Sequence, residues 1–237
     1  METKFDYAAV ETGYYDRVYR KQKGAQSKWH WLKFQYMRDL LPKEGKLLDI
    51  ACSAGTFIGS LDEGLDATGV DIAASQVDYA SEHYGAPGKR FLQMDEGKLP
   101  FDDNTFDAVT VIELVEHLTV EQNRAILAEA WRVLKPKTGV LVVSTPNYHS
   151  GWPVLEILVN KLGELSYADQ HITKFHRRRL ADLLRGSGFH QVEARPYQGV
   201  APFGAMLGWR FADFLYRIER WGLSGIYGFL LVATARK

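Results

Sequence analysis

Cysteine, excess charge and long apolar runs are what this sequence lacks, and each absence narrows its class. The single cysteine, Cys52, among 237 residues excludes an internal disulfide and fits a reducing compartment. Lysine plus arginine and aspartate plus glutamate each number 29, so no overall charge draws the chain to nucleic acid or an anionic membrane. No apolar run reaches membrane-spanning length, and the first residues have the pattern of neither a signal nor a transit peptide. A soluble cytoplasmic protein is therefore predicted.

The chain is rich in apolar residues, and its most informative stretch is residues 45–59. A hydrophobic content of 46% fills the core of one α/β domain without a metal or a disulfide. The stretch reads GKLLDIACSAGTFIG, which indicates a buried strand, a tight turn of small residues and the start of a helix. Small side chains let a ligand approach the backbone, and the helix N-terminus offers free N–H groups. A cofactor-binding turn and a strand-to-helix turn without a ligand both fit this pattern.

Two acidic residues further along the chain add features of a nucleoside site. Asp71 ends a predicted second strand 22 positions beyond Asp49, where a carboxylate can accept hydrogen bonds from both hydroxyls of a ribose. After a short third strand at residues 89–93, Asp95 can accept from an adenine amine while Met94 packs on the ring. The turn lacks the Gly-x-Gly-x-x-Gly of dinucleotide binders, which disfavours a nicotinamide-dependent oxidoreductase.

Several motifs, taken in order, resemble those of class I S-adenosylmethionine-dependent methyltransferases. Asp49 and Gly55 match the acidic-x-Gly-x-Gly-x-Gly motif of that family, with Ala51 and Ser53 in place of two glycines. The stretches LPFDDNTFD and WRVLKPKTG, at residues 99–107 and 131–139, also look like the family's. The resemblance implies an α/β fold: a seven-stranded, mostly parallel Rossmann-like sheet with helices on both faces and an antiparallel last strand.

The resemblance also implies a cofactor and a set of residues that bind it. The cofactor is S-adenosyl-L-methionine, with S-adenosyl-L-homocysteine as its product, and the acceptor is a small molecule. The residues assigned to the cofactor are Asp49, Ala51, Cys52, Ser53, Gly55, Asp71, Ile72, Met94, Asp95, Glu96, Glu113 and Tyr15.

The most reactive-looking cluster, ELVEHL at residues 113–118, follows the predicted fourth strand. In a helical turn that opens at Glu113, Glu116 and His117 share its face, at the edge where α/β active sites lie. His117, oriented by Glu116, could then remove a proton from an acceptor hydroxyl. Alternatively, the cluster binds a divalent metal, or the acids cap a helix and the histidine is structural.

The Glu-x-x-Glu-His pattern resembles ubiquinone-pathway O-methyltransferases and small-RNA ribose methyltransferases, which place such residues around a magnesium-type ion. The second resemblance adds His171 to the set. We predict His117, Glu116 and His171 as the catalytic residues, and a divalent metal is not favoured.

Segments outside the sheet are predicted to complete the acceptor site. Residues 1–44 are expected to form an N-terminal helical cap, and residues 45–237 the methyltransferase domain. This domain carries a lid-like insertion at about residues 146–176 and an aromatic-rich helix at about 204–222. The apolar face of that helix suits a homodimer contact, the lid, an apolar acceptor or a membrane surface.

The predicted reaction is methyl transfer to a hydroxyl of a small or apolar molecule. Transfer to nitrogen is one alternative, and a non-catalytic cofactor-binding or membrane-associated protein is another. Neither a nucleic-acid partner nor a transmembrane segment is expected.

Overall fold

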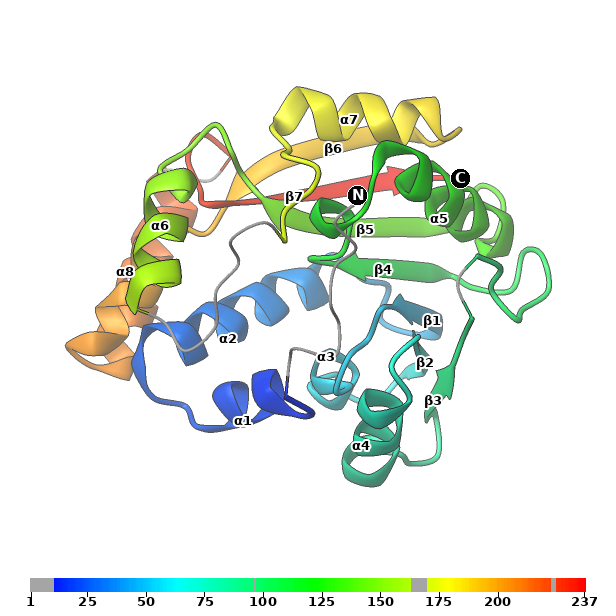
Figure 1. Cartoon of the computed structure of the whole chain (residues 1–237), viewed down its shortest axis with the longest axis horizontal. Helices are drawn as coiled ribbons and strands as arrows, with labels where there is room; N and C mark the ends of the chain where they lie inside the picture. The colour runs from blue at the N-terminus through cyan, green and yellow to red at the C-terminus, as the bar shows by residue number, and fades with distance from the viewer. Residues whose placement is uncertain (1–10, 96, 163–169, 223–224) are drawn as a thin grey trace.

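A computed structural model describes residues 11–95, 97–162, 170–222 and 225–237, and it contains one sheet of seven strands (Figure 1). The strand order is β3-β2-β1-β4-β5-β7-β6. Strand β7 pairs antiparallel with both of its neighbours, whereas the other pairs are parallel. The predicted mostly parallel sheet with an antiparallel last strand is confirmed. In chain order the strands are β1 Gly45–Ile50, β2 Leu65–Asp71, β3 Lys89–Gln93, β4 Ala108–Ile112, β5 Val140–Pro146, β6 His190–Tyr197 and β7 Leu230–Arg236.

Helices cover both faces of this sheet, as Figure 1 shows. One face carries α5 and α7, and the other carries α2, α3 and α4, with α1 beside them. The helices are α1 Tyr14–Arg20, α2 Gly24–Asp39, α3 Thr56–Gly59, α4 Ala74–Tyr84, α5 Val120–Val133, α6 Trp152–Leu162, α7 Arg177–Gly186 and α8 Trp209–Gly222. Two short 3-10 helices, η2 Val115–His117 and η3 Ala201–Met206, lie between them in the chain.

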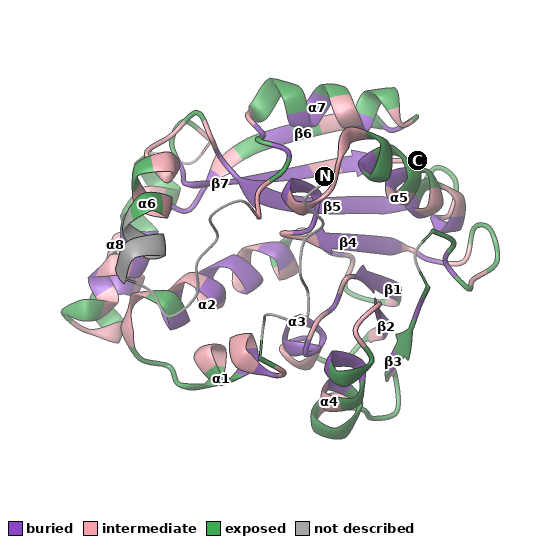
Figure 2. Ribbon diagram, viewed as in Figure 1, coloured by how far each residue is buried: buried purple, intermediate pink, exposed green. Residues whose placement is uncertain are grey.

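The central strands are buried on both faces, because successive side chains point to opposite sides of a strand. Leu47 packs with the helices of one layer and Leu48 with those of the other, and Val142 and Val143 divide in the same way. Figure 2 shows the result as a buried band along β4, β5 and β7. The two cores hold the carboxyl ends of β1, β2, β4 and β5 in fixed register, so the loops that follow them meet at one edge.

One predicted element is divided in the structure. The aromatic-rich helix expected at about 204–222 forms η3 and α8, because Gly208 between them has φ +153°, a value that an L side chain rarely adopts. In the part of the chain that the structure describes, no helix is long and apolar enough to cross a membrane.

Candidate active site at the carboxyl ends of the strands

The turn after β1 has an alternating left-handed backbone. Ala51, Ser53 and Gly55 have φ values of 59°, 48° and 72°, so the residues at the three glycine positions of the motif all adopt the conformation that favours glycine. Ala51 and Ser53 therefore carry backbone strain, which is typical of functional turns. The Ser53 N–H donates to Asp71 Oδ2 at 2.8 Å, which ties the turn to the end of β2.

Two residues of this turn serve packing. A Cβ on Gly55 would lie 2.7 Å from both Ala80 and Phe91, so this glycine makes room for α4 and β3. Cys52 is buried, and its sulfur would lie 2.8 Å from a Cβ on Gly69 of β2. The predicted contacts of Gly55 and Cys52 with a cofactor can therefore involve only their backbone groups.

Two buried carboxyl groups lie beside the turn. Asp71 accepts from the Ser53 and Ala73 N–H groups at 2.8 and 2.9 Å, and burial raises the pKa of its carboxyl. Asp49 accepts from the Thr110 hydroxyl at 2.6 Å. Burial raises the pKa of Asp49 to about 7, and the nearby Asp71 charge adds to the rise. A positive charge next to this pair would favour the ionised form of both carboxyl groups.

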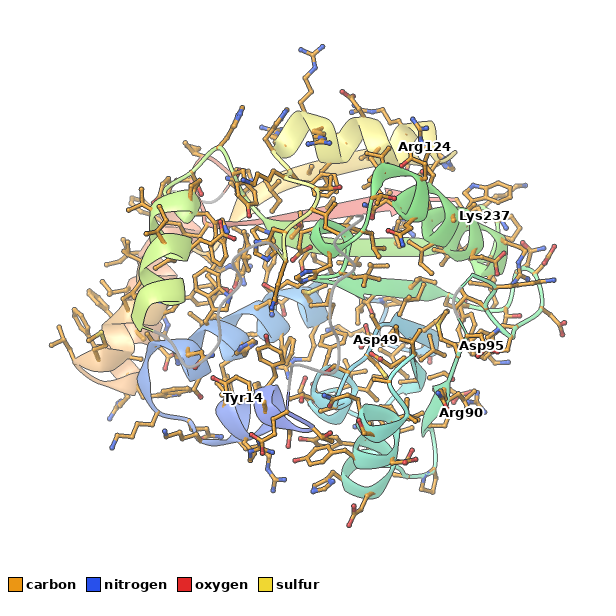
Figure 3. All side chains as sticks on the ribbon, viewed as in Figure 1. Tyr14, Asp49, Arg90, Asp95, Arg124 and Lys237 are labelled. Carbon is orange, nitrogen blue, oxygen red and sulfur yellow. The ribbon has the colours of Figure 1, made fainter. Side chains whose placement is uncertain are left out.

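The residues predicted to hold an adenine differ in exposure. Ile72 is half-buried, Met94 is buried and Asp95 is exposed. Figure 3 shows Asp49 near the middle of the molecule and Asp95 on the β3 side of it. Glu96, also predicted to bind the cofactor, lies outside the described residues.

Helix α1 is anchored over this corner by Asp16, which the sequence analysis did not single out. Asp16 is fully buried and accepts hydrogen bonds from the hydroxyls of Thr56, Tyr79 and Tyr84. The adjacent Tyr15 packs on His30 of α2 with ring centroids 5.5 Å apart. The N-terminal helices thus reach the open edge of the sheet, although their role as a cap stays a prediction.

The helical turn expected to open at Glu113 is wrong. Glu113 has φ +51°, and residues 115–117 form a single 3-10 turn, so Glu113 lies outside the turn that carries Glu116 and His117. Glu113 pairs with Lys33, a fully buried lysine of α2, and the lysine charge lowers the pKa of the glutamate. No sequence signal marks Lys33, because it lies within the apolar pattern of its helix.

Glu116 is buried, and His117 contacts a backbone group. Glu116 is 1% exposed, and its Oε2 has no hydrogen-bond partner among the described residues. Burial raises the pKa of its carboxyl to about 8, so it is protonated at neutral pH. His117 Nδ1 lies 3.0 Å from the Gln170 carbonyl oxygen, and burial lowers the pKa of the imidazole to about 4. His117 is therefore neutral, and the Nδ1 proton is donated to Gln170.

The carboxylate that orients a histidine is Glu156. Its Oε1 pairs with His171 Nδ1, and its two oxygens accept from the Tyr148 hydroxyl at 2.9 and 3.1 Å. The centroids of the His171 and His117 rings lie 5.1 Å apart. Burial lowers the pKa of His171, and Glu156 opposes that change. Sequence reasoning missed Glu156 and Tyr148, because the contact joins α6 to a loop 15 residues away and neither residue belongs to a motif.

These groups could hold a metal or perform acid–base chemistry. One ligand atom from each of Glu116, His117 and His171 lies within 4.8 Å of the others. Glu113, the fourth residue considered for a metal, is not in this group and is paired with Lys33. A neutral imidazole beside a carboxylate-oriented one is also the arrangement of a general base.

The donor groups fit a sulfonium nucleoside. Asp71 offers carboxylate oxygens for ribose hydroxyls, and Asp49 and Asp71 together favour a cationic ligand. Met94 adds a thioether that can pack on an adenine ring.

Comparison with known proteins finds methyltransferases. A model of the methyltransferase domain matches residues 48–143. The ubiquinone/menaquinone biosynthesis C-methyltransferase UbiE of Desulfotalea psychrophila is 28% identical over 83% of this chain and 85% of its own length. Demethylmenaquinone methyltransferase of Anoxybacillus flavithermus is 26% identical over 72% of this chain and 81% of its own. Among solved structures, an S-adenosylmethionine-dependent methyltransferase of Thermotoga maritima superimposes with a TM-score of 0.68 and 22% identity, covering 94% of each chain.

Proposed function

The chain is a class I S-adenosylmethionine-dependent methyltransferase, and from this premise we propose that it methylates a ring carbon adjacent to the hydroxyl of an aromatic or quinol acceptor. The methyl donor when bound supplies an electrophilic methyl group on a sulfonium. The chain's own residues position the acceptor for in-line attack and take its hydroxyl proton. The observation that carries the proposal is the Glu156–His171 pair beside the neutral His117.

A base is needed because a phenol-type hydroxyl becomes strongly electron-donating only after it loses its proton. His171 accepts that proton, and the Glu156 carboxylate stabilises the imidazolium that forms. Negative charge then spreads to the neighbouring ring carbon, which would take the methyl group that a bound donor supplies, leaving the donor as a neutral thioether. The ring-carbon proton would then leave to restore aromaticity and the His171 imidazolium would return its proton to the oxygen, so the net balance is one methyl group gained and one proton released.

Carbon is chosen over oxygen on the basis of the relatives. A bacterial relative that matches 83% of this chain is named a C-methyltransferase, and both outcomes begin from the same deprotonated hydroxyl. The sequence analysis predicted methylation of the hydroxyl itself. One experiment can therefore distinguish that outcome from methylation of the ring carbon. The apolar rings around His171, including Trp152 at 6.4 Å between centroids, suit an acceptor with a flat apolar ring.

The test is turnover with a methyl donor labelled with carbon-13 in its methyl group and a hydroxylated naphthoquinol as acceptor. The chemical shift of the product methyl distinguishes a carbon-bound from an oxygen-bound group. We expect a carbon-bound methyl and a large loss of turnover in Glu156→Gln, whereas Trp131→Ala on α5 serves as the unaffected control. An oxygen-bound methyl group would show that the acceptor atom is the hydroxyl oxygen and not the ring carbon. Binding of S-adenosyl-L-homocysteine without transfer to any phenolic acceptor would refute the acceptor class.

A further inference from the structure

Helix α8 turns its apolar stripe toward solvent. Phe211, Phe214, Ile218 and Trp221 recur at helical spacing along one face, and all four are exposed, with Trp221 92% exposed. Leu207, which precedes the helix, is 82% exposed. A surface helix normally buries such a stripe against the core. A contiguous exposed apolar face of this kind marks an interaction surface. We call it the α8 stripe.

The opposite side of α8 fixes the stripe in its outward orientation. Ala212 and Tyr216 are buried against the rest of the protein, and the Tyr216 hydroxyl lies 3.1 Å from that of Tyr197 on β6. Lys28, a fully buried lysine of α2, pairs with Asp213 at 2.5 Å and lies 4.1 Å from the centre of the Trp209 ring. Rotating the stripe inward would break these contacts, so its exposure is built into the fold.

Internal contacts also determine the charge beside the stripe. The two acids of α8 are both engaged within the protein: Asp213 binds Lys28, and Glu219 accepts from the N–H groups of residues 199 and 201. Arg210 and Arg217 are exposed on one flank of the stripe, and no ion pair links them to another described residue. The face is therefore apolar with a basic border, even though the whole chain has no net charge.

We propose that the α8 stripe docks on an anionic phospholipid bilayer. Trp and Phe side chains on one face with arginines at its border are the pattern of helices that lie in the membrane interface, and each basic side chain is attracted to acidic headgroups. A second copy of this chain is a poorer occupant, because a symmetric contact would place the same basic borders near each other with no free acid on that face.

A line of aromatic rings runs from the candidate active site to the segment that follows α8 in the chain. His171 lies 6.4 Å from Trp152, Trp152 lies 5.7 Å from Trp29, and Trp29 lies 6.3 Å from Phe229. Phe229 lies 5.5 Å from Tyr227, which is exposed just after α8 in the chain. A membrane-dissolved acceptor of the proposed reaction could follow this apolar wall, but the docking itself does not depend on that reaction.

Co-sedimentation of the full chain with vesicles tests the proposal. The vesicles contain phosphatidylcholine alone or with one third phosphatidylglycerol. We expect binding to the anionic vesicles that weakens at high salt. Trp221→Ala should weaken it about tenfold, and the double variant Arg210→Gln/Arg217→Gln roughly thirtyfold.

Matched controls lie on α5 and α7, away from α8 (Figure 1). Trp131→Ala removes another exposed tryptophan, and Arg177→Gln/Arg178→Gln removes two other exposed arginines; both should bind as the wild type does. Equal binding by all variants, or none to anionic vesicles, overturns the proposal. A dimer in sedimentation velocity that Trp221→Ala abolishes assigns the stripe to a second copy and overturns it too. Affinity for S-adenosyl-L-homocysteine, measured in parallel, shows that each variant is folded and keeps this result separate from the proposed reaction.

Discussion

Replacing Asp49 with asparagine should stabilise the ligand-free protein at neutral pH. The pKa of its carboxyl is raised from 3.8 to about 7, so between these values the folded state binds a proton that the unfolded state has lost. The contribution of this group to the unfolding free energy therefore falls as pH rises from about 4 to about 7, by about 4 kcal/mol in total, and is level above that range. Asparagine keeps an oxygen for the Thr110 hydroxyl and removes the charge.

Urea unfolding of wild type and Asp49→Asn between pH 4 and pH 8 measures this effect. The two proteins should be similarly stable near pH 4, and the variant should gain up to about 4 kcal/mol by pH 7. Glu116, whose pKa is also raised, is present in both proteins, so its contribution cancels in the difference. If Asp49 serves the cationic methyl donor, the same variant should bind S-adenosylmethionine roughly tenfold or more weakly. Parallel stability curves across this pH range would refute the reasoning.

Three further substitutions test the turn after β1 and the histidine site. Gly55→Ala should cost at least about 3 kcal/mol of unfolding free energy, because φ is +72° and the new Cβ would collide with side chains of α4 and β3; thermal unfolding measures it. Ala51→Gly should instead gain about 0.5–1 kcal/mol by relieving a left-handed alanine, and unchanged stability would show that this backbone is not strained. Glu156→Gln should lower kcat about 100-fold with the KM for the methyl donor unchanged. If His171 is the base, the rate of this variant should recover at high pH, because the acceptor hydroxyl then ionises without a base.

The sheet could be predicted because burial on both faces leaves an unmistakable pattern. The apolar β-branched run of β4 and the expected bounds of β3 appear in the structure unchanged. The glycine positions of the motif were also informative. Gly55, and Ala51 and Ser53 in place of the other two glycines, all adopt the left-handed backbone. Family resemblance to methyltransferases correctly anticipated the cofactor class and the antiparallel β7.

The acceptor side of the site could not be predicted in the same way. Its contacts join residues that are far apart in sequence: Lys33 reaches Glu113 across 80 positions, and Lys28 reaches Asp213 across 185. Helical periodicity treated both lysines as ordinary members of α2. The left-handed backbone at Glu113 separates this residue from the 3-10 turn of Glu116 and His117, which helical periodicity had not predicted.

Strain and buried charge in this protein gather at one edge of the sheet. The left-handed Ala51 and Ser53, the buried carboxyls of Asp49 and Glu116 with their raised pKa values, and the neutral His117 all lie at or after the carboxyl ends of β1 and β4. The strained backbone and the buried carboxyls lower the stability of the folded state at neutral pH, the buried imidazole of His117 does so below about pH 6.5, and a sequence selected for stability alone would replace them. A cationic ligand beside Asp49 and a hydroxyl acceptor beside the histidines would convert these costs into binding energy. The positions at which the fold is least stable are therefore the positions at which we expect methyl transfer to take place.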